Sequence, residues 1–114
     1  MDFSFDESQQ AAHDLAHQIL SDKLTMERLM TIEASGEWIA RAEWAELGNV
    51  GLIGIAFRED VGGGGLDEVA WGAVLQAHGE TVAPLPLLAS SLAGMAIDRF
   101  GSDQQRQQWL PKVA

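Results

Sequence analysis

The sequence contains no cysteine, which excludes disulfide bonds and thiolate metal sites. It is also poor in positive charge, with seven lysine and arginine residues against seventeen acidic ones and a formal net charge of −10. A field of that sign repels nucleic acid and anionic lipid, so neither is an expected partner. The first ten residues are acidic where a signal peptide is basic, and we therefore expect a soluble cytoplasmic protein without membrane insertion.

The longest uncharged stretch of the chain runs from Thr81 to Ile97. Pro84 and Pro86, near its start, can open a helix but cannot continue one. The residues that follow, Leu87–Phe100, are good helix formers that are apolar on nearly every face, as in a helix buried in a core or inserted in a membrane. The run is too short to span a bilayer, which takes about 20 apolar residues. We therefore predict a buried helix here.

The rest of the chain has helical periodicity and no strand pattern of period two. Apolar spacing predicts helices at about Asp6–Ser21, Glu37–Leu47, Leu66–Gly79 and Ser102–Pro111, while Leu24–Ile32 either extends the first helix or forms a short second one. A chain of 114 residues is enough for one domain with a modest core. The predicted fold class is all-α: a helical bundle or orthogonal array of about five helices around a central apolar helix at about residues 86–100.

Local signals mark the ends of several predicted helices. Ser4 and Glu7 have the spacing of a capping box, and so do Ser102 and Gln105. Gly48 is well placed to end its helix in the left-handed conformation.

Two connections between the predicted helices are rich in glycine. The segment Val50–Phe57 is too short for a helix and is predicted to be extended and buried where it is apolar. The segment Gly62–Gly65 precedes a helix, as a phosphate-binding loop does, but lacks the lysine of such a loop. Asp67 and Glu68 would also repel a phosphate from the helix N-terminus. We interpret Gly62–Gly65 as a tight turn.

No self-contained active site is visible in the sequence. His13 and His17 are four residues apart and share a helix face, but Asp14 stands where a metalloprotease motif has glutamate, and no third ligand is evident. We expect two solvent-facing histidines and no metal site. Ser90 and Ser91 are expected to bond to a carbonyl one turn earlier rather than to act as nucleophiles. The acidic side chains are expected to be solvated at the surface, and no catalytic residue is predicted.

Three motifs follow one another over about 70 residues. A helix ends in Glu46-Leu47-Gly48, an acidic turn with paired glycines follows at Glu59-Asp60-Val61-Gly62-Gly63, and Phe100-Gly101-Ser102-Asp103-Gln104-Gln105 precedes Trp109-Leu110-Pro111-Lys112. In order and spacing these motifs closely resemble the N-terminal region of the FAD-dependent acyl-CoA dehydrogenases. One departure is Arg58, which stands where the family usually has a proline and is not expected to change the fold.

The resemblance implies that residues 1–114 are the N-terminal α-helical domain of such an enzyme. The middle β-domain and the C-terminal helical domain, which hold most FAD contacts and the catalytic glutamate in the family, are then absent from this chain. The implied reaction of the whole enzyme is α,β-dehydrogenation of an acyl-CoA thioester, in lipid metabolism such as fatty acid or steroid degradation. The implied cofactor is FAD, and the implied partners are the acyl-CoA substrate, an electron-transfer acceptor and the other subunits of a homo- or hetero-oligomer. The chain alone is expected to bind no FAD and to be inactive.

The resemblance also implies a substrate-binding wall. Leu85, Leu88, Ala89 and Leu92 align with family positions that face the fatty tail of the substrate. The three leucines recur at spacings of 3 and 4 and therefore share one helix face, with Ala89 beside them. The same residues could instead be ordinary core. Two alternatives for the whole chain also stay open: a stand-alone interaction or subunit module without catalysis, and a helical ligand-binding bundle unrelated to flavoenzymes.

Overall fold

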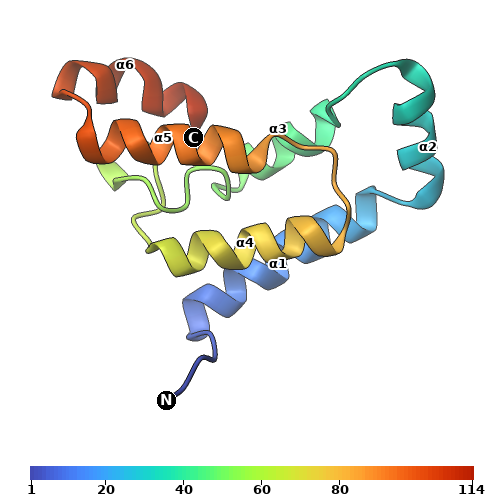
Figure 1. The fold of residues 1–114 in the computed structure, drawn as a ribbon, viewed down its shortest axis with the longest axis horizontal. Coiled ribbons are helices and arrows are strands. Elements are labelled where there is room, and N and C mark those ends of the chain that lie inside the picture. Colours follow the sequence, from blue (N-terminus) through green and yellow to red (C-terminus); the bar gives the residue numbers. More distant parts are fainter.

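The chain folds into six α-helices and one short 3-10 turn, without a β-strand, in the computed structural model of residues 1–114 (Figure 1). In chain order the elements are α1 (Glu7–Lys23), α2 (Met26–Ser35), α3 (Arg41–Asn49), η1 (Glu59–Val61), α4 (Glu68–Glu80), α5 (Leu87–Phe100) and α6 (Asp103–Val113). The predicted all-α class is confirmed. The segment Leu24–Ile32, which was predicted either to extend the first helix or to form a second one, lies mostly in a separate helix, α2.

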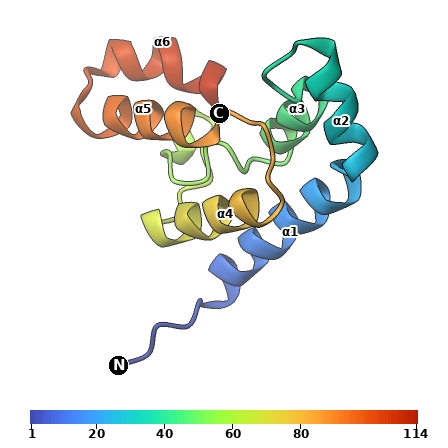
Figure 2. The same ribbon diagram turned by 45° about the vertical axis from the view of Figure 1, so that its right-hand side comes forward.

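Helices α1 and α4 lie side by side and form the centre of the main core (Figures 1 and 2). Alanines supply much of their contact: Ala12 and Ala16 of α1 and Ala70 and Ala77 of α4 are buried. A methyl group keeps a helix surface low, so the two axes can approach closely. Larger side chains complete this core, namely Leu20, Leu24, Ile32, Leu47, Leu52, Ile53, Ile55, Val74 and Leu87.

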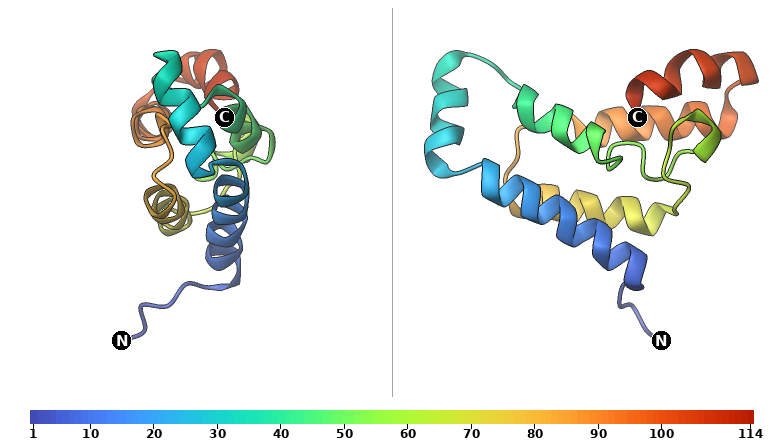
Figure 3. Two further views of the ribbon diagram at one scale, coloured as in Figure 1. Left: turned by 90° about the vertical axis from the view of Figure 1, so that its right-hand side faces the viewer. Right: turned by 180° about the vertical axis from the view of Figure 1, so that it is seen from behind.

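Helices α5 and α6 form an antiparallel pair on the other side of the connection between α3 and α4 (Figures 1 and 3). A small second core of Phe57, Val61 and Leu110 lies between this pair and the connection. Gly94 of α5 lies against the Phe57 ring, because a Cβ at position 94 would be 2.1 Å from Phe57 Cζ. Helix α5 can therefore pack here only because residue 94 has no side chain.

The connection after α3 is buried as predicted, but it is not extended. It folds as a series of turns in which Leu52, Ile53, Ile55 and Phe57 are buried. The left-handed residue that ends α3 is Gly51, with a φ of 82°, whereas Gly48 lies inside the helix. The prediction for Gly48 is therefore wrong by three residues.

Hydrogen bonds at the starts of α1 and α3 account for two further differences from the predictions. Asp6, rather than Ser4, caps α1, because the Asp6 side chain accepts from the Gln9 backbone N–H and the Gln9 side chain accepts from the Asp6 N–H. The capping box of Ser102 and Gln105 at the start of α6 is confirmed. Helix α3 begins at Arg41, four residues later than predicted. The preceding Ala40 N–H donates instead to the carbonyl of Pro84, 3.0 Å away.

The helix predicted at Leu87–Phe100 exists with those bounds, but the prediction that it is buried on nearly every face is wrong. Only Leu87, Ser91 and Gly94 are buried, and they form one narrow stripe. Leu88 and Leu92 are 54% and 53% exposed, because no other part of the chain covers that side of α5. None of the six helices has both the length and the hydropathy that crossing a membrane requires.

The contact between Gly94 and Phe57 predicts a large effect of one methyl group. Gly94→Ala should lower the free energy of unfolding by about 1–3 kcal/mol, because the new Cβ overlaps the Phe57 ring in a closely packed core. Urea unfolding followed by circular dichroism measures this difference. Gly72→Ala is the matched control, since a Cβ at Gly72 meets nothing within 4 Å and should stabilise α4 by about 0.5–1 kcal/mol. Equal stability of Gly94→Ala and the parent chain would contradict the packing described.

Candidate functional site: the outer face of helix α5

Three of the four predicted substrate-binding residues lie together on one exposed surface. Leu88, Ala89 and Leu92 are on the side of α5 opposite its buried stripe, and all three are exposed. Leu85 is separate from them, since it precedes the helix, is half-buried and packs against the main core. We call the exposed surface the α5 outer face; it comprises Leu88, Ala89, Leu92, Ala93, Ala96 and Phe100.

The α5 outer face carries no charge until the last turn of the helix. There Asp98 pairs with Arg58, with 3.0 Å between Oδ1 and Nε, and Arg99 pairs with Glu68 at the start of α4. Arg58 also donates from Nη2 to the Asp98 carbonyl, so the arginine at the family's proline position links η1 to α5. Beside these pairs, Leu92, Met95, Ala96, Arg99 and Phe100 line a shallow groove of about 180 Å³. The surface can offer apolar contact, but it has no nucleophile or base.

The buried stripe of α5 holds the outer face in place. Ser91 is fully buried and its hydroxyl donates to the carbonyl of Ile53, 3.0 Å away in the connection after α3. The expected bond from Ser91 to its own helix is therefore wrong, but its exclusion as a nucleophile stands, since it is out of reach of solvent. The linker before α5 is constrained as well, because Val82 has a φ of 53° and the Pro84 carbonyl accepts from Ala40.

The glycine-rich loop does not fit the pyrophosphate of a flavin or another phosphate. Every backbone N–H from Gly62 to Leu66 donates to a carbonyl of the protein, at 2.9–3.0 Å, so none is left for a ligand. A Cβ at Gly63 would lie 2.3 Å from the Phe57 carbonyl oxygen, and one at Gly64 would lie 2.8 Å from the Ile55 carbonyl oxygen. The glycines are therefore needed for close packing of the loop, and the interpretation as a tight turn is confirmed.

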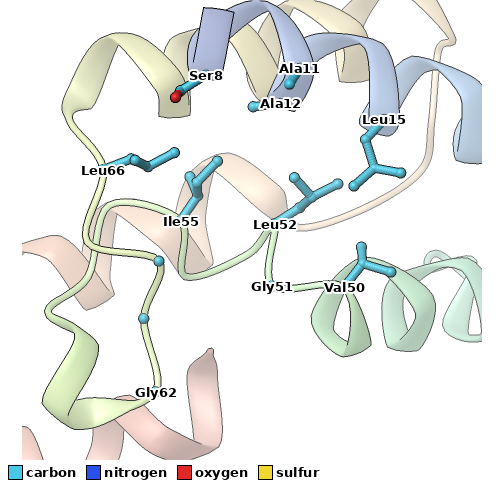
Figure 4. Close-up of a pocket in the computed structure, with 12 residues that line it drawn as sticks. Ser8, Ala11, Ala12, Leu15, Val50, Gly51, Leu52, Ile55, Gly62 and Leu66 are labelled. Carbon is cyan, nitrogen blue, oxygen red and sulfur yellow. The ribbon is translucent and has the colours of Figure 1, made fainter.

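A larger apolar cavity was not foreseen from the sequence. It measures about 320 Å³ and lies between α1 and the connection from α3 to α4 (Figure 4). Leu15, Leu52, Ile55 and Leu66 line it, and Ser8 supplies the one hydroxyl. Leu66 was predicted to begin a helix, but it precedes α4 and is part-exposed at this cavity. No titratable side chain lines the cavity, so it can hold an apolar group but cannot catalyse a proton transfer.

The two histidines contact each other and one carboxylate of α4. No group of three or more histidine, cysteine, aspartate or glutamate side chains is arranged to hold a metal ion. His13 and His17 instead stack, with ring centroids 5.8 Å apart, and both face Glu80 of α4. The side chain of His13 is only 16% exposed, so the expectation that both histidines face solvent is wrong for His13.

One buried carboxylate was also missed. The side chain of Glu43 in α3 is only 5% exposed, and Arg28 of α2 donates to it from Nε and Nη2 at 3.0 and 3.3 Å. These hydrogen bonds lower the pKa of Glu43 below its ordinary value. The two residues are fifteen positions apart on different helices, so no local sequence pattern predicts the pair. Its role is structural, since it joins α2 to α3 away from the α5 outer face.

The buried pair predicts a pH-dependent contribution to stability. Glu43→Gln should lower the free energy of unfolding at pH 7 by about 1–3 kcal/mol, because it weakens charge-assisted hydrogen bonds in a buried site. A lowered pKa in the folded state means that this stabilisation is present at neutral pH and is lost as the pH falls through the folded pKa. Urea unfolding at pH 7 and at pH 3 should therefore show the difference between the two chains shrinking in acid.

The control for this experiment is Glu37→Gln, which removes the glutamate of an exposed ion pair with Arg41 in place of the buried one. Exposed pairs contribute about 0–1 kcal/mol, so the change should be small at both pH values. If Glu37→Gln and Glu43→Gln had equal effects at pH 7, burial of the Glu43 pair would not matter.

The sequence model of the family described as "Acyl-CoA dehydrogenase, N-terminal domain" matches residues 6–114. The chain belongs to the acyl-CoA dehydrogenase family. Its resemblance to that family, inferred above from three motifs, is thereby confirmed.

Relatives of this acyl-CoA dehydrogenase domain show how far the likeness extends. It is 33% identical to acyl-CoA dehydrogenase FadE27 of Mycobacterium tuberculosis over 96% of this chain and 30% of that protein. Acyl-CoA dehydrogenase FadE12 of the same species is 36% identical over 62% of this chain and 19% of its own length. The chain therefore spans less than a third of the curated relatives it matches.

Two solved structures share the fold. In the ChsE4-ChsE5 complex from M. tuberculosis, one chain superposes with a TM-score of 0.92 at 31% identity, over 99% of this chain and 31% of that one. The Tcur3481-Tcur3483 steroid ACAD G363A variant superposes with a TM-score of 0.87 at 39% identity, over 94% and 29% of the two chains.

Proposed function

We propose that this chain serves as the N-terminal domain of an FAD-dependent acyl-CoA dehydrogenase and that the α5 outer face forms one wall of its acyl-binding cavity. The observation that carries the proposal is the exposure of Leu88 and Leu92 on a helix face without charge, in a chain that belongs to this family. An exposed apolar surface of this kind marks a site that another surface or a ligand covers.

The chemistry of the surface suits an acyl chain. Each CH₂ group of an acyl tail that is buried against an apolar wall contributes about 0.8 kcal/mol. Leu88 and Leu92 are one helical turn apart and present branched side chains, while Ala89, Ala93 and Ala96 leave room beside them. Leu85 supports the start of the wall from the main core and stays part of the proposed site.

The proposed reaction of the whole enzyme is α,β-dehydrogenation of an acyl-CoA thioester. A base removes the α-proton, and FAD, when bound, supplies the acceptor for the hydride that leaves the β-carbon. The residues of this chain offer neither a base beside the α5 outer face nor a phosphate cradle in the glycine-rich loop. We therefore assign to this chain the apolar wall and part of the packing between subunits, and the remaining domains hold the catalytic groups.

The names of the relatives favour a lipid substrate and an assembly of subunits. One solved relative is described as a steroid ACAD, and the other as a complex of two named proteins. By analogy, we propose a lipid-derived acyl-CoA as substrate, an electron-transfer acceptor as redox partner, and a homo- or hetero-oligomer as the working form.

The wall can be tested in the intact enzyme that contains this domain. Leu92→Ala should raise KM for a long acyl-CoA by up to about tenfold, because it removes roughly 1.4 kcal/mol of apolar contact from the tail. The same change should affect a short acyl-CoA little, since a short tail does not reach the wall. Leu15→Ala is the control, because Leu15 is similarly part-exposed but lines the cavity beside α1. An equal fold-change in KM for long and short substrates in Leu92→Ala would refute the wall.

A separate measurement tests whether the catalytic groups lie outside this chain. The purified 114-residue chain should be colourless and should reduce no electron acceptor when acyl-CoA is added, because its α5 outer face has no base and the backbone N–H groups of its glycine-rich loop are already bonded. A yellow preparation that turns over acyl-CoA would show that the chain needs no further domain.

A further inference from the structure

His13 lies between two carboxylates. Its Nδ1 is 3.1 Å from Oδ1 of Asp14, and its Nε2 is 3.1 Å from Oε2 of Glu80. An ionised carboxylate only accepts hydrogen bonds, and a neutral imidazole has a single N–H to donate. The imidazolium form has two N–H groups and satisfies both carboxylates. The observed geometry is therefore complete only when His13 is protonated.

The other groups around His13 do not replace this proton. His17 is the second cationic candidate, but its Nε2 is 3.7 Å from the same Glu80 oxygen, too far for a hydrogen bond. Neutral amides also donate to the two carboxylates: Gln76 donates to Oε1 of Glu80 at 2.9 Å, and Gln10 donates at 2.8 Å to Oδ1 of Asp14, the oxygen that faces His13. No lysine or arginine pairs with either carboxylate among the ion pairs of the structure. The Phe5 ring, 6.5 Å from the His13 ring, adds an apolar neighbour without charge.

The contact joins α1 to the end of α4. Glu80 is the last residue of α4, and Thr81 and Val82 follow it with N–H groups that donate to the carbonyls of Ala77 and Gly79. Val82 has a φ of 53°, which is unfavourable for a β-branched residue and must be held by its surroundings. The linker that leads to α5 leaves α4 from this turn, so a contact at Glu80 steadies both.

We propose that His13 and Glu80 form a pH-sensitive lock between α1 and the last turn of α4, closed when His13 is protonated and open when it is neutral. This proposal rests on the contact itself and not on the function proposed above. In the open state the neutral ring of His13 has one N–H for two carboxylates, and in either tautomer its contact with Glu80 loses the attraction between opposite charges. The last turn of α4 and the start of the linker then fray more readily, and their amide hydrogens exchange faster.

The direction of the pH dependence follows from the neighbouring charges. The hydrogen bond to Asp14 raises the pKa of His13, partial burial opposes this, and Glu80 raises it further. A raised folded pKa means that the stabilisation is fully present below the ordinary histidine pKa of about 6.5 and is lost as the pH rises through the folded value. The pKa values of Asp14 and Glu80 are lowered, so protonation of these carboxylates opens the lock only in acid.

Amide hydrogen exchange of the 114-residue chain tests the lock. Between pH 5.5 and pH 8, the protection factors of the Thr81 and Val82 amides should fall by about two- to fivefold, the range for a partly exposed ion pair. In Glu80→Gln, which keeps the shape of the side chain but not its charge, the protection factors should be the same at both pH values. Glu68→Gln is the control, because it removes a charge from the other end of α4, where Glu68 pairs with Arg99, and should keep the parent's pH dependence.

Two results would overturn the proposal. One is protection factors that do not depend on pH in the parent chain, and the other is a fall in the protection factors of Glu80→Gln as large as that in the parent chain. A second measurement does not depend on any variant. The ring protons of His13, followed by NMR in the parent chain, should titrate above the ordinary pKa of about 6.5. Titration at or below that value would show that the two carboxylates do not hold the proton, and the lock would be rejected.

Discussion

Much of the structure depends on one constraint: Phe57 packs directly against the backbone of two glycines. The ring lies on Gly94 of α5, and Gly63 of the glycine-rich loop passes close to the Phe57 carbonyl. A Cβ at either glycine would block that glycine's approach to Phe57. Because Phe57 also contacts Val61 and Leu110, one aromatic residue in an irregular connection joins α5, α6 and η1 to the rest of the chain.

The two cores have different consequences for function. The alanine-rich contact of α1 and α4 makes the main core closely packed, and the Arg28–Glu43 pair extends it to α2 and α3. The second core is small and holds α5 by a stripe of only Leu87, Ser91 and Gly94. A helix that is held along one narrow stripe presents most of its circumference outward, which is why α5 offers a surface to the acyl chain proposed above.

Several features set by local chemistry were predictable from the sequence, although the caps predicted at Ser4 and Gly48 were wrong, whereas features set by distant contacts were not. The capping box at Ser102 and the bounds of α5 depend on neighbouring residues, and both were predicted. The burial of α5 depends on what covers it, and apolar composition alone does not say whether the cover lies in the same chain. Likewise, the buried state of Glu43 depends on Arg28 in another helix. Of the predicted site, the three residues inside the helix share a surface, but Leu85 precedes α5 and faces the core.

The narrow stripe of α5 also separates two kinds of requirement along one helix. Positions 87, 91 and 94 must satisfy the interior of the domain, where one added methyl group or one lost hydroxyl is felt. Positions 88, 89 and 92 are exposed and belong to neither core, so leucine or alanine there can be exchanged for larger or smaller side chains without repacking a core. The surface proposed to contact the acyl group can therefore vary in size and shape among proteins with this domain while the fold stays the same.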